Sequence, residues 1–194
     1  DSESGKGVII DPGDEPDKIK TAAARHSIQP AAILLTHAHV DHIRGLSDLV
    51  AEFGMPVFLH QDDKALYESS ENSLEPWLSA AENLPPVTAD FDAVKTLPFT
   101  LIHTPGHSPG GCCFYLKESD ALFSGDTLFA GSVGRADLPG GDLDLLVKSI
   151  SEKLMTLPPE TQVCPGHGPT TTIGAEKASN PYVRGELNPD RRVI

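Results

Sequence analysis

Four potential metal ligands fall within six residues in the first quarter of the chain: His37, His39, Asp41 and His42. In an extended segment, residues i and i+2 point to the same side, so His37 and His39 can grip one ion. The expected turn into a helix swings Asp41 and His42 toward a second ion. The alternative is a capping Asp among solvated histidines, but four ligand-type residues in one run favour a metal site.

Three more ligand-type residues occur in the second half, each after a short apolar run and a glycine. They are His107 in Pro-Gly-His, Asp126 in Ser-Gly-Asp and His167 in a second Pro-Gly-His. A ligand at a strand end is held by the sheet, and the preceding glycine lets the backbone pass close to an ion. Imidazole and carboxylate suit Zn(II), Fe(II) or Mn(II), and no cysteine ligand is required. We expect two divalent ions, zinc first, with iron or manganese as alternatives.

This donor set predicts hydrolysis. Two dications against two carboxylates keep a net positive charge, which favours hydroxide at a metal-bridging position and lowers the pKa of bound water toward about 7. A polarised ester or thioester carbonyl can then be attacked without a serine or cysteine nucleophile. Asp41 and Asp126 are accordingly the candidate catalytic carboxylates, and Cys164 is interpreted as a buried core residue.

The elements that must position these ligands alternate between strand and helix in the first half. The expected strands and helices there fall at 8–10, 17–26, 31–36, 45–53 and 57–60. The run 31–36 is continuously apolar, as in a strand covered on both faces. This alternation predicts an α/β fold, and the length fits one domain over residues 1–194.

The second half is richer in strands. A polar stretch, 61–86, is expected first, as helices of an inserted segment. A β-meander, a helix capped by Asp142 and a final strand are then expected, before a polar tail that follows Ile173. These elements fall at 99–103, 111–116, 121–124, 142–157 and 161–164.

Composition excludes several classes of function. Lys and Arg number 15 against 28 Asp and Glu, so the formal charge is 15 − 28 = −13 with neutral histidines. Because nucleic-acid affinity comes from basic side chains displacing counterions, nucleic acid is a poor partner. No apolar run approaches the roughly 18 residues that a membrane helix needs. Three cysteines give no disulfide framework, which favours a reducing, cytoplasmic location. The oligomeric state stays open.

The motifs together resemble those of the metallo-β-lactamase superfamily, whose H-x-H-x-D-H signature is followed by a later His, an Asp and a final His. The similarity runs over residues 11–169, nearly the whole chain. It implies an αββα four-layer sandwich. It also implies a ligand set: His37, His39 and His107 hold one metal, Asp41, His42 and His167 hold the other, and Asp126 bridges them.

Within the superfamily, the stretches 104–110 and 124–129 are similar to glyoxalase II, the hydroxyacylglutathione hydrolases. The stretches 134–137 and 171–182 resemble the compact, single-domain branch, which lacks the C-terminal helical domain of longer members. The resemblance implies cleavage of a small thioester such as S-lactoylglutathione. The alternative is a persulfide dioxygenase with mononuclear Fe(II), which would use His37, His107 and Asp126. A lactonase and a nuclease are weaker alternatives, and the charge of −13 disfavours the nuclease.

Two residues are candidates for binding the substrate. Arg135 lies in a Gly-bounded loop, and its guanidinium can bind a carboxylate of a glutathione-type substrate bidentately. The equally weighted alternative is a structural pair with Asp137. Tyr182 follows the last ligand and is expected either to line the pocket or to lie in a disordered tail. His26, His60 and His103 are interpreted as surface or satisfied histidines.

Overall fold

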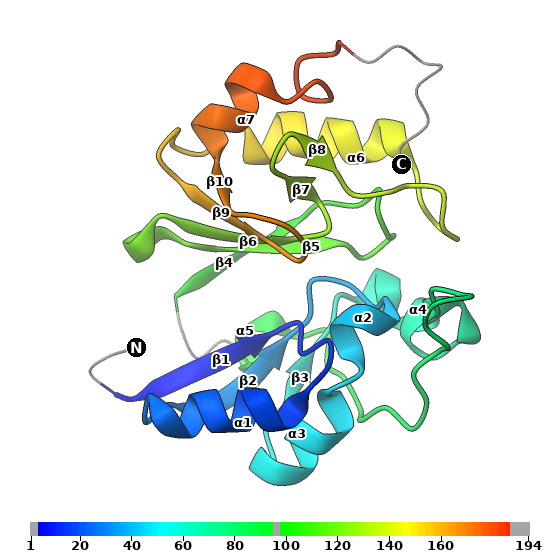
Figure 1. The fold of residues 1–194 in the computed structure, drawn as a ribbon, viewed down its shortest axis with the longest axis vertical. Helices are drawn as coiled ribbons and strands as arrows, with labels where there is room; N and C mark the ends of the chain where they lie inside the picture. Colours follow the sequence, from blue (N-terminus) through cyan, green and yellow to red (C-terminus); the bar gives the residue numbers. More distant parts are fainter. Residues whose placement is uncertain (1–3, 95–97, 187–194) are drawn as a thin grey trace. The chain divides into compact units, whose positions relative to one another are not determined.

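The computed structural model describes residues 4–94 and 98–186, and internal contacts divide the chain into two units, unit 1 at 1–98 and unit 2 at 99–194 (Figure 1). Each unit has its own sheet and its own hydrophobic core. The expected single domain over 1–194 stays a prediction. None of the helices within the described residues is both long and apolar enough to cross a membrane.

Unit 1 contains a three-stranded parallel sheet in the order β1-β2-β3. Because its strands are parallel, their carboxyl ends meet at one edge, where the loops after β1 and β2 begin. The connections between strands are helical, as the alternating pattern predicts (Figure 1). The elements are β1 (Lys6–Ile10), α1 (Pro16–Arg25), β2 (Gln29–Leu34), α2 (Val40–Ile43), α3 (Leu46–Phe53) and β3 (Val57–Phe58).

Local sequence explains where these helices begin and end. Pro16 opens α1, where its fixed φ suits the first turn and its missing N–H costs nothing. The helix α3 ends at Gly54, whose φ of 63° lies in the left-handed region that glycine adopts freely. Leu46 and Leu49 of α3 are fully buried and pack with Ile33 of β2 in the core of unit 1.

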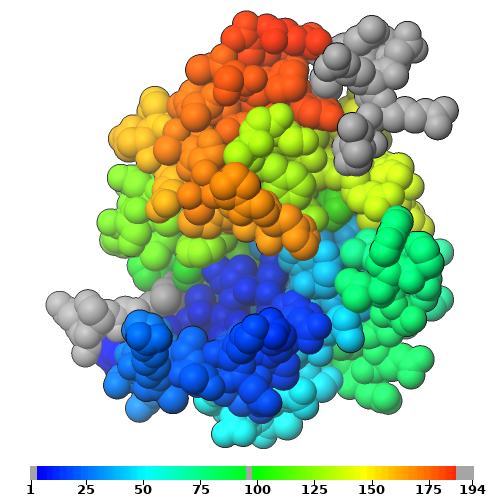
Figure 2. Space-filling model, in the orientation of Figure 1, coloured from blue at the N-terminus to red at the C-terminus, as the bar shows by residue number. Residues whose placement is uncertain are grey.

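The polar segment 61–86 contains helices, as expected, and each of them is short. The buried side chain of Asn72 holds this segment together through hydrogen bonds to its backbone. Its Nδ2 donates to the carbonyl of Ser69 (2.9 Å), and its Oδ1 accepts from Ala81 N (3.0 Å). Figure 2 shows this segment in blue-green at the surface of unit 1. The short elements from here to the end of unit 1 are η1 (Gln61–Asp63), α4 (Lys64–Tyr67), η2 (Ser70–Asn72) and α5 (Phe91–Val94).

Unit 2 contains a five-stranded mixed sheet in the order β10-β9-β6-β5-β4. The expected meander is present as the antiparallel run β4-β5-β6, and β9 joins β6 in parallel. A separate hairpin, β7-β8, follows β6. The strands are β4 (Phe99–His103), β5 (Cys112–Leu116), β6 (Ala121–Gly125), β7 (Leu128–Phe129), β8 (Ser132–Val133), β9 (Gln162–Pro165) and β10 (Thr171–Thr172), with η3 (Lys117–Ser119) between β5 and β6.

The long helix of unit 2 begins as expected and ends earlier. Asp142 caps α6 (Leu143–Ser149) by accepting from Leu145 N at 3.0 Å. The helix continues as a π-helical turn, η4 (Ile150–Leu154), so it stops at Leu154 rather than Leu157. Its buried leucines Leu146 and Leu154 pack on the sheet through Leu122 and Val163.

The expectation of a polar tail after Ile173 is wrong. Residues Ile173–Ser179 form the helix α7, capped by Thr172, whose side chain accepts from Ala175 N at 3.2 Å. Ile173 is fully buried in the core of unit 2 and Glu176 is 2% exposed, so packing rather than helix propensity holds this segment.

Candidate metal centre

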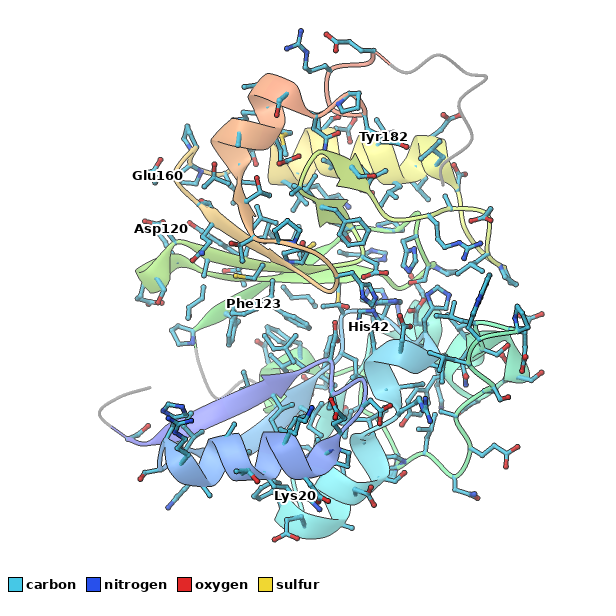
Figure 3. All side chains as sticks on the ribbon, in the orientation of Figure 1. Lys20, His42, Asp120, Phe123, Glu160 and Tyr182 are labelled. Carbon is cyan, nitrogen blue, oxygen red and sulfur yellow. The ribbon has the colours of Figure 1, made fainter. Side chains whose placement is uncertain are left out.

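The H-x-H-x-D-H run lies at the carboxyl edge of the sheet of unit 1. The rings of His37, His39 and His42 are almost fully buried. The centroid of the His37 ring lies 4.9 Å from that of His39 and 4.1 Å from that of His42. The side chain of His42 extends from α2 toward this edge (Figure 3), and its Nε2 lies 3.8 Å from Oδ2 of Asp41. All four predicted ligands of unit 1 are thus gathered beyond the end of β2.

A fifth residue of this edge, Asp11, was missed as a site residue by the sequence reasoning, which took it only as part of a turn. Asp11 follows β1, and its carboxylate accepts from Thr36 N (2.7 Å) and Thr36 Oγ1 (2.6 Å). Its Oδ2 lies 3.0 Å from Nδ1 of His42. Because the carboxylate can only accept, Nδ1 of His42 carries the proton and Nε2 is the nitrogen suited to a metal.

The backbone of Asp11 supports the same arrangement. Its φ of 47° lies in the left-handed region, which aspartate tolerates better than most residues. Gly13 then passes so close to the backbone of Asp41 that a Cβ would lie 1.8 Å from the carbonyl oxygen of Asp41. Gly45 N donates to the carbonyl of Pro12 at 2.8 Å. This bond and the close approach of Gly13 hold the turn after β1 next to the segment that carries the ligands.

We expect Asp11→Asn to weaken metal binding by about 10- to 100-fold, because losing the partner of a metal-ligating histidine typically has this effect. Asparagine tolerates the same backbone conformation, so the turn is preserved. Competition with a chromogenic chelator measures the change. Asp14→Asn is the matched control, since Asp14 is exposed and pairs with Arg44 at 3.6 Å. Equal affinities for the two variants would contradict the role of Asp11.

Asp63 is a second supporting carboxylate that the sequence reasoning missed. It is fully buried, and its Oδ2 accepts from Ala38 N at 3.0 Å. Ala38 lies between His37 and His39, so this bond fixes the backbone that carries both rings. Its sequence signal is weak, because the two partners are 25 residues apart.

In unit 2, two predicted histidine ligands converge on one oxygen atom of the third predicted ligand, Asp126. Oδ2 of Asp126 lies 3.7 Å from Nε2 of His107 and 3.8 Å from Nε2 of His167. These residues follow β4, β6 and β9, whose chain directions agree, so their carboxyl ends meet at one edge of the sheet. The side chains of His107 and Asp126 are 4% and 13% exposed, whereas that of His167 is 54% exposed.

His107 is oriented by the backbone of the loop that follows β8. Its Nδ1 lies 2.7 Å from the carbonyl oxygen of Arg135, so Nδ1 donates and Nε2 faces Asp126. Gly134 makes the close approach possible, because a Cβ there would lie 1.8 Å from the carbonyl oxygen of Asp126. On the other side, Gly106 (φ 133°) packs against α6, where a Cβ would lie 2.3 Å from Leu146 N.

The side chain of Arg135 forms a bidentate pair with Asp137. Nε donates to Oδ1 and Nη2 donates to Oδ2, both at 2.7 Å. This hydrogen bonding lowers the pKa of the Asp137 carboxyl and raises that of the guanidinium. The pair proposed as an alternative is therefore present, and it is largely solvent-exposed. Substrate binding by Arg135 stays a prediction.

The remaining candidates lie elsewhere in their units. Tyr182 packs against Val147 and Ile150, beside α6 in Figure 3, so it belongs to the packing of unit 2, and its role in binding substrate stays a prediction. His26 is exposed and Nε2 of His103 lies 3.0 Å from the carbonyl oxygen of Pro109, in agreement with their interpretation. Cys164 is partly buried, which raises the pKa of its thiol.

The donor chemistry of both units fits divalent metal ions. Buried imidazoles oriented through Nδ1, next to carboxylate oxygens, are the ligands that Zn, Fe and Mn accept, and no thiolate is involved. Asp11, His37 and His42 each offer a ligand atom, and these atoms lie within 4.8 Å of one another. One centre formed by the ligands of both units stays a prediction.

Comparisons with known proteins agree with this chemistry. The model of the metallo-beta-lactamase superfamily matches residues 2–167. A probable metallo-hydrolase of Bacillus subtilis, YqgX, is 42% identical over 92% of this chain and 87% of its own. The hydroxyacylglutathione hydrolase GloC of Haemophilus influenzae is 33% identical, covering 92% of this chain and 88% of its own.

A solved structure supports the fold as well. The crystal structure of TTHA1623 in a di-iron-bound form has a TM-score of 0.83 and 46% identity, covering 90% of this chain and 88% of that chain. The expected α/β fold of the metallo-β-lactamase type is confirmed.

Proposed function

Because this chain belongs to the metallo-beta-lactamase superfamily and is a metallo-hydrolase, we propose that it cleaves small acyl thioesters such as S-lactoylglutathione, with two divalent ions, zinc foremost. The similarity to a hydroxyacylglutathione hydrolase supports the substrate class. The di-iron form of a structural relative makes iron the second choice of metal.

The observation that carries the proposal is the position of Asp126. One carboxylate oxygen faces Nε2 of two histidines at nearly equal distances, 3.7 and 3.8 Å, a spacing that suits donor atoms of a common metal site. In this proposal, His37, His39 and His107 hold the first ion. Asp41, His42 and His167 hold the second ion, and Asp126 is shared.

Divalent ions in such a centre would polarise the thioester carbonyl and make hydroxide available at neutral pH. The chain's own groups fix the geometry. The imidazole of His42 is held in one tautomer by Asp11, and that of His107 by the carbonyl of Arg135. Ionised Asp41 and Asp126 can only accept hydrogen bonds, so they can orient an attacking water. Hydrolysis therefore needs no covalent acyl-enzyme.

One observation favours the alternative, a mononuclear iron dioxygenase acting on persulfides. His167 is 54% exposed, far more than His107 at 4%, so it is the ligand that a smaller site would lose. Such a site would use His37, His107 and Asp126.

Metal content and reaction type separate the two functions. Zn, Fe and Mn are quantified per chain in protein purified without added metal. The same preparation is assayed for cleavage of S-lactoylglutathione, a neutral thioester, a lactone and a β-lactam, and for oxygen consumption with glutathione persulfide. We expect two ions per chain and thioester cleavage. One iron per chain with persulfide-dependent oxygen uptake would establish the alternative instead.

We expect Arg135→Ala to raise KM for a glutathione thioester by about one to two powers of ten with kcat nearly unchanged, because a charge-assisted hydrogen bond is lost in ground and transition states alike. The backbone carbonyl that orients His107 remains in this variant. Initial rates on glutathione and neutral thioesters measure the effect.

Asp137→Ala is the matched control for Arg135→Ala, since it releases the guanidinium without removing it. In Asp137→Ala, KM for the glutathione thioester should either stay unchanged or decrease. Equal losses in both variants, on both substrates, would show that the pair only shapes the loop.

A further inference from the structure

A buried carboxylate outside the predicted ligand set connects the segments that carry the ligands of unit 2. Glu176, on α7, is only 2% exposed. Its Oε1 accepts from Thr171 Oγ1 at 2.6 Å, and its Oε2 accepts from Gly131 N at 2.9 Å and from Asn180 Nδ2 at 2.7 Å. A buried carboxylate must be satisfied to be tolerated, and these neutral donors supply three hydrogen bonds.

The first of these bonds reaches the hairpin that carries His167. The strands β9 and β10 pair in antiparallel fashion, and His167 lies in the loop that joins them. Glycines flank His167 on both sides, which gives the loop little stiffness of its own. Gly166 N donates to the carbonyl of Gly125 and holds the first side of the loop. Thr171, bonded to Glu176, holds the second side.

The other bonds reach the hairpin that follows Asp126. Gly131 lies in the turn of β7-β8, and Asn180 extends the contact by donating to the carbonyl of Ser132 at 3.0 Å. Asp126 lies two residues before β7, and Arg135, whose carbonyl accepts from His107, lies two residues after β8. The centroid of the Phe129 ring on this hairpin also lies 6.5 Å from the centroid of the His167 ring.

We propose that Glu176 is a positioning residue that clamps the β7-β8 and β9-β10 hairpins together and thereby fixes His167 relative to Asp126. The inference rests on the proposed function, because it assigns the clamp to the ion held by His167. None of these three hydrogen bonds of Glu176 comes from a predicted ligand. Loss of the bond to Thr171, which reaches only the hairpin of His167, should therefore weaken the second ion selectively.

Two adjacent threonines provide the test. Thr171→Val removes the hydroxyl that reaches Glu176, and Thr172→Val removes the hydroxyl that caps α7. Both changes keep the β-branched shape that suits β10. Glu176→Ala removes all three hydrogen bonds. Glu176→Gln is the conservative rescue, since its amide oxygen can keep the bonds from Gly131 and Asn180 while its amide nitrogen donates to Thr171 Oγ1.

Stepwise zinc titration against a chelator measures the two affinities separately. Thr171→Val should weaken the second ion by about 10- to 100-fold and leave the first within a few fold, and Glu176→Ala should weaken the second ion at least as much. Glu176→Gln should recover most of this loss. Thr172→Val should lower Tm without a selective effect. Equal weakening of both ions by Thr171→Val, or equal effects of the two threonine variants, would overturn the proposal.

Hydrogen exchange in metal-free protein gives an independent result. Glu176→Ala should speed amide exchange at 129–134 and 166–170, and Thr171→Val only at 166–170, because an opened clamp frees each hairpin it held. Unchanged exchange in both variants would also overturn the clamp. This measurement does not depend on what the wild-type protein hydrolyses or how many ions it binds, so failure of the proposed function is distinguishable from failure of the clamp.

Discussion

Asp126→Ala should abolish nearly all hydrolysis, with a fall in kcat/KM on the order of 10³-fold, because the loss of electrostatic stabilisation at a reacting centre has effects of this size. The side chain faces Nε2 of His107 and Nε2 of His167 through one oxygen. Its removal takes a ligand from both ions of the proposed centre. Metal content should fall below two per chain in the same preparation, measured by elemental analysis.

The other end of the strand that precedes Asp126 supplies a control. Asp120 and Asp126 flank opposite ends of β6, so Asp120→Asn and Asp126→Asn each remove one charge next to the same strand. Asp120 has a φ of 46°, which asparagine tolerates, and it accepts from Tyr115 OH at 3.3 Å. Activity should survive the first change and not the second. Two metals per chain and ordinary activity in Asp126→Asn would remove Asp126 from the site.

The ligand run of unit 1 could be predicted because its information is local. His37, His39, Asp41 and His42 lie within six residues, and the apolar strand before them is visible in the sequence. The edge location follows from the parallel pairing of β1 with β2, which is typical of strands that alternate with helices. The glycines before Asp126 and His167 likewise marked strand ends.

The supporting groups could not be predicted, because their partners are distant in sequence. Asp11 meets His42 across 31 residues, and only the parallel pairing of β1 with β2 brings them to one edge. Glu176 meets Gly131 across 45 residues. Polar residues of this kind look like ordinary surface in a sequence, since nothing local shows that they are buried.

The errors in secondary structure have the same origin. The segment at α7 has the composition of a polar tail, and it is helical because Ile173 and Glu176 are buried against the rest of unit 2. The long helix was expected to reach Leu157, but the pattern of apolar residues does not reveal the π-helical turn at 150–154. Tertiary packing decides both cases, and the helix propensities of the residues carry no information about that packing.

Removal of metal should abolish hydrolysis and destabilise the fold together. Ions that bind only the folded chain stabilise it by mass action, so metal-free protein should unfold at a lower Tm, measured by calorimetry before and after dialysis against a chelator. The buried imidazoles of His37, His39 and His42 make unit 1 the part where this stabilisation is expected to be greatest.

The order in which activity returns distinguishes the two kinds of centre. Zinc is added back in known ratios to metal-free protein, and thioester cleavage is followed at each step. In a two-ion hydrolase, activity should stay low through the first equivalent and rise through the second, because the proposed shared carboxylate, Asp126, then has both of its ions. Full activity after one equivalent would reduce the centre to one ion. Hydrolysis by metal-free protein, or an acyl group trapped on a side chain, would reject metal-dependent hydrolysis altogether.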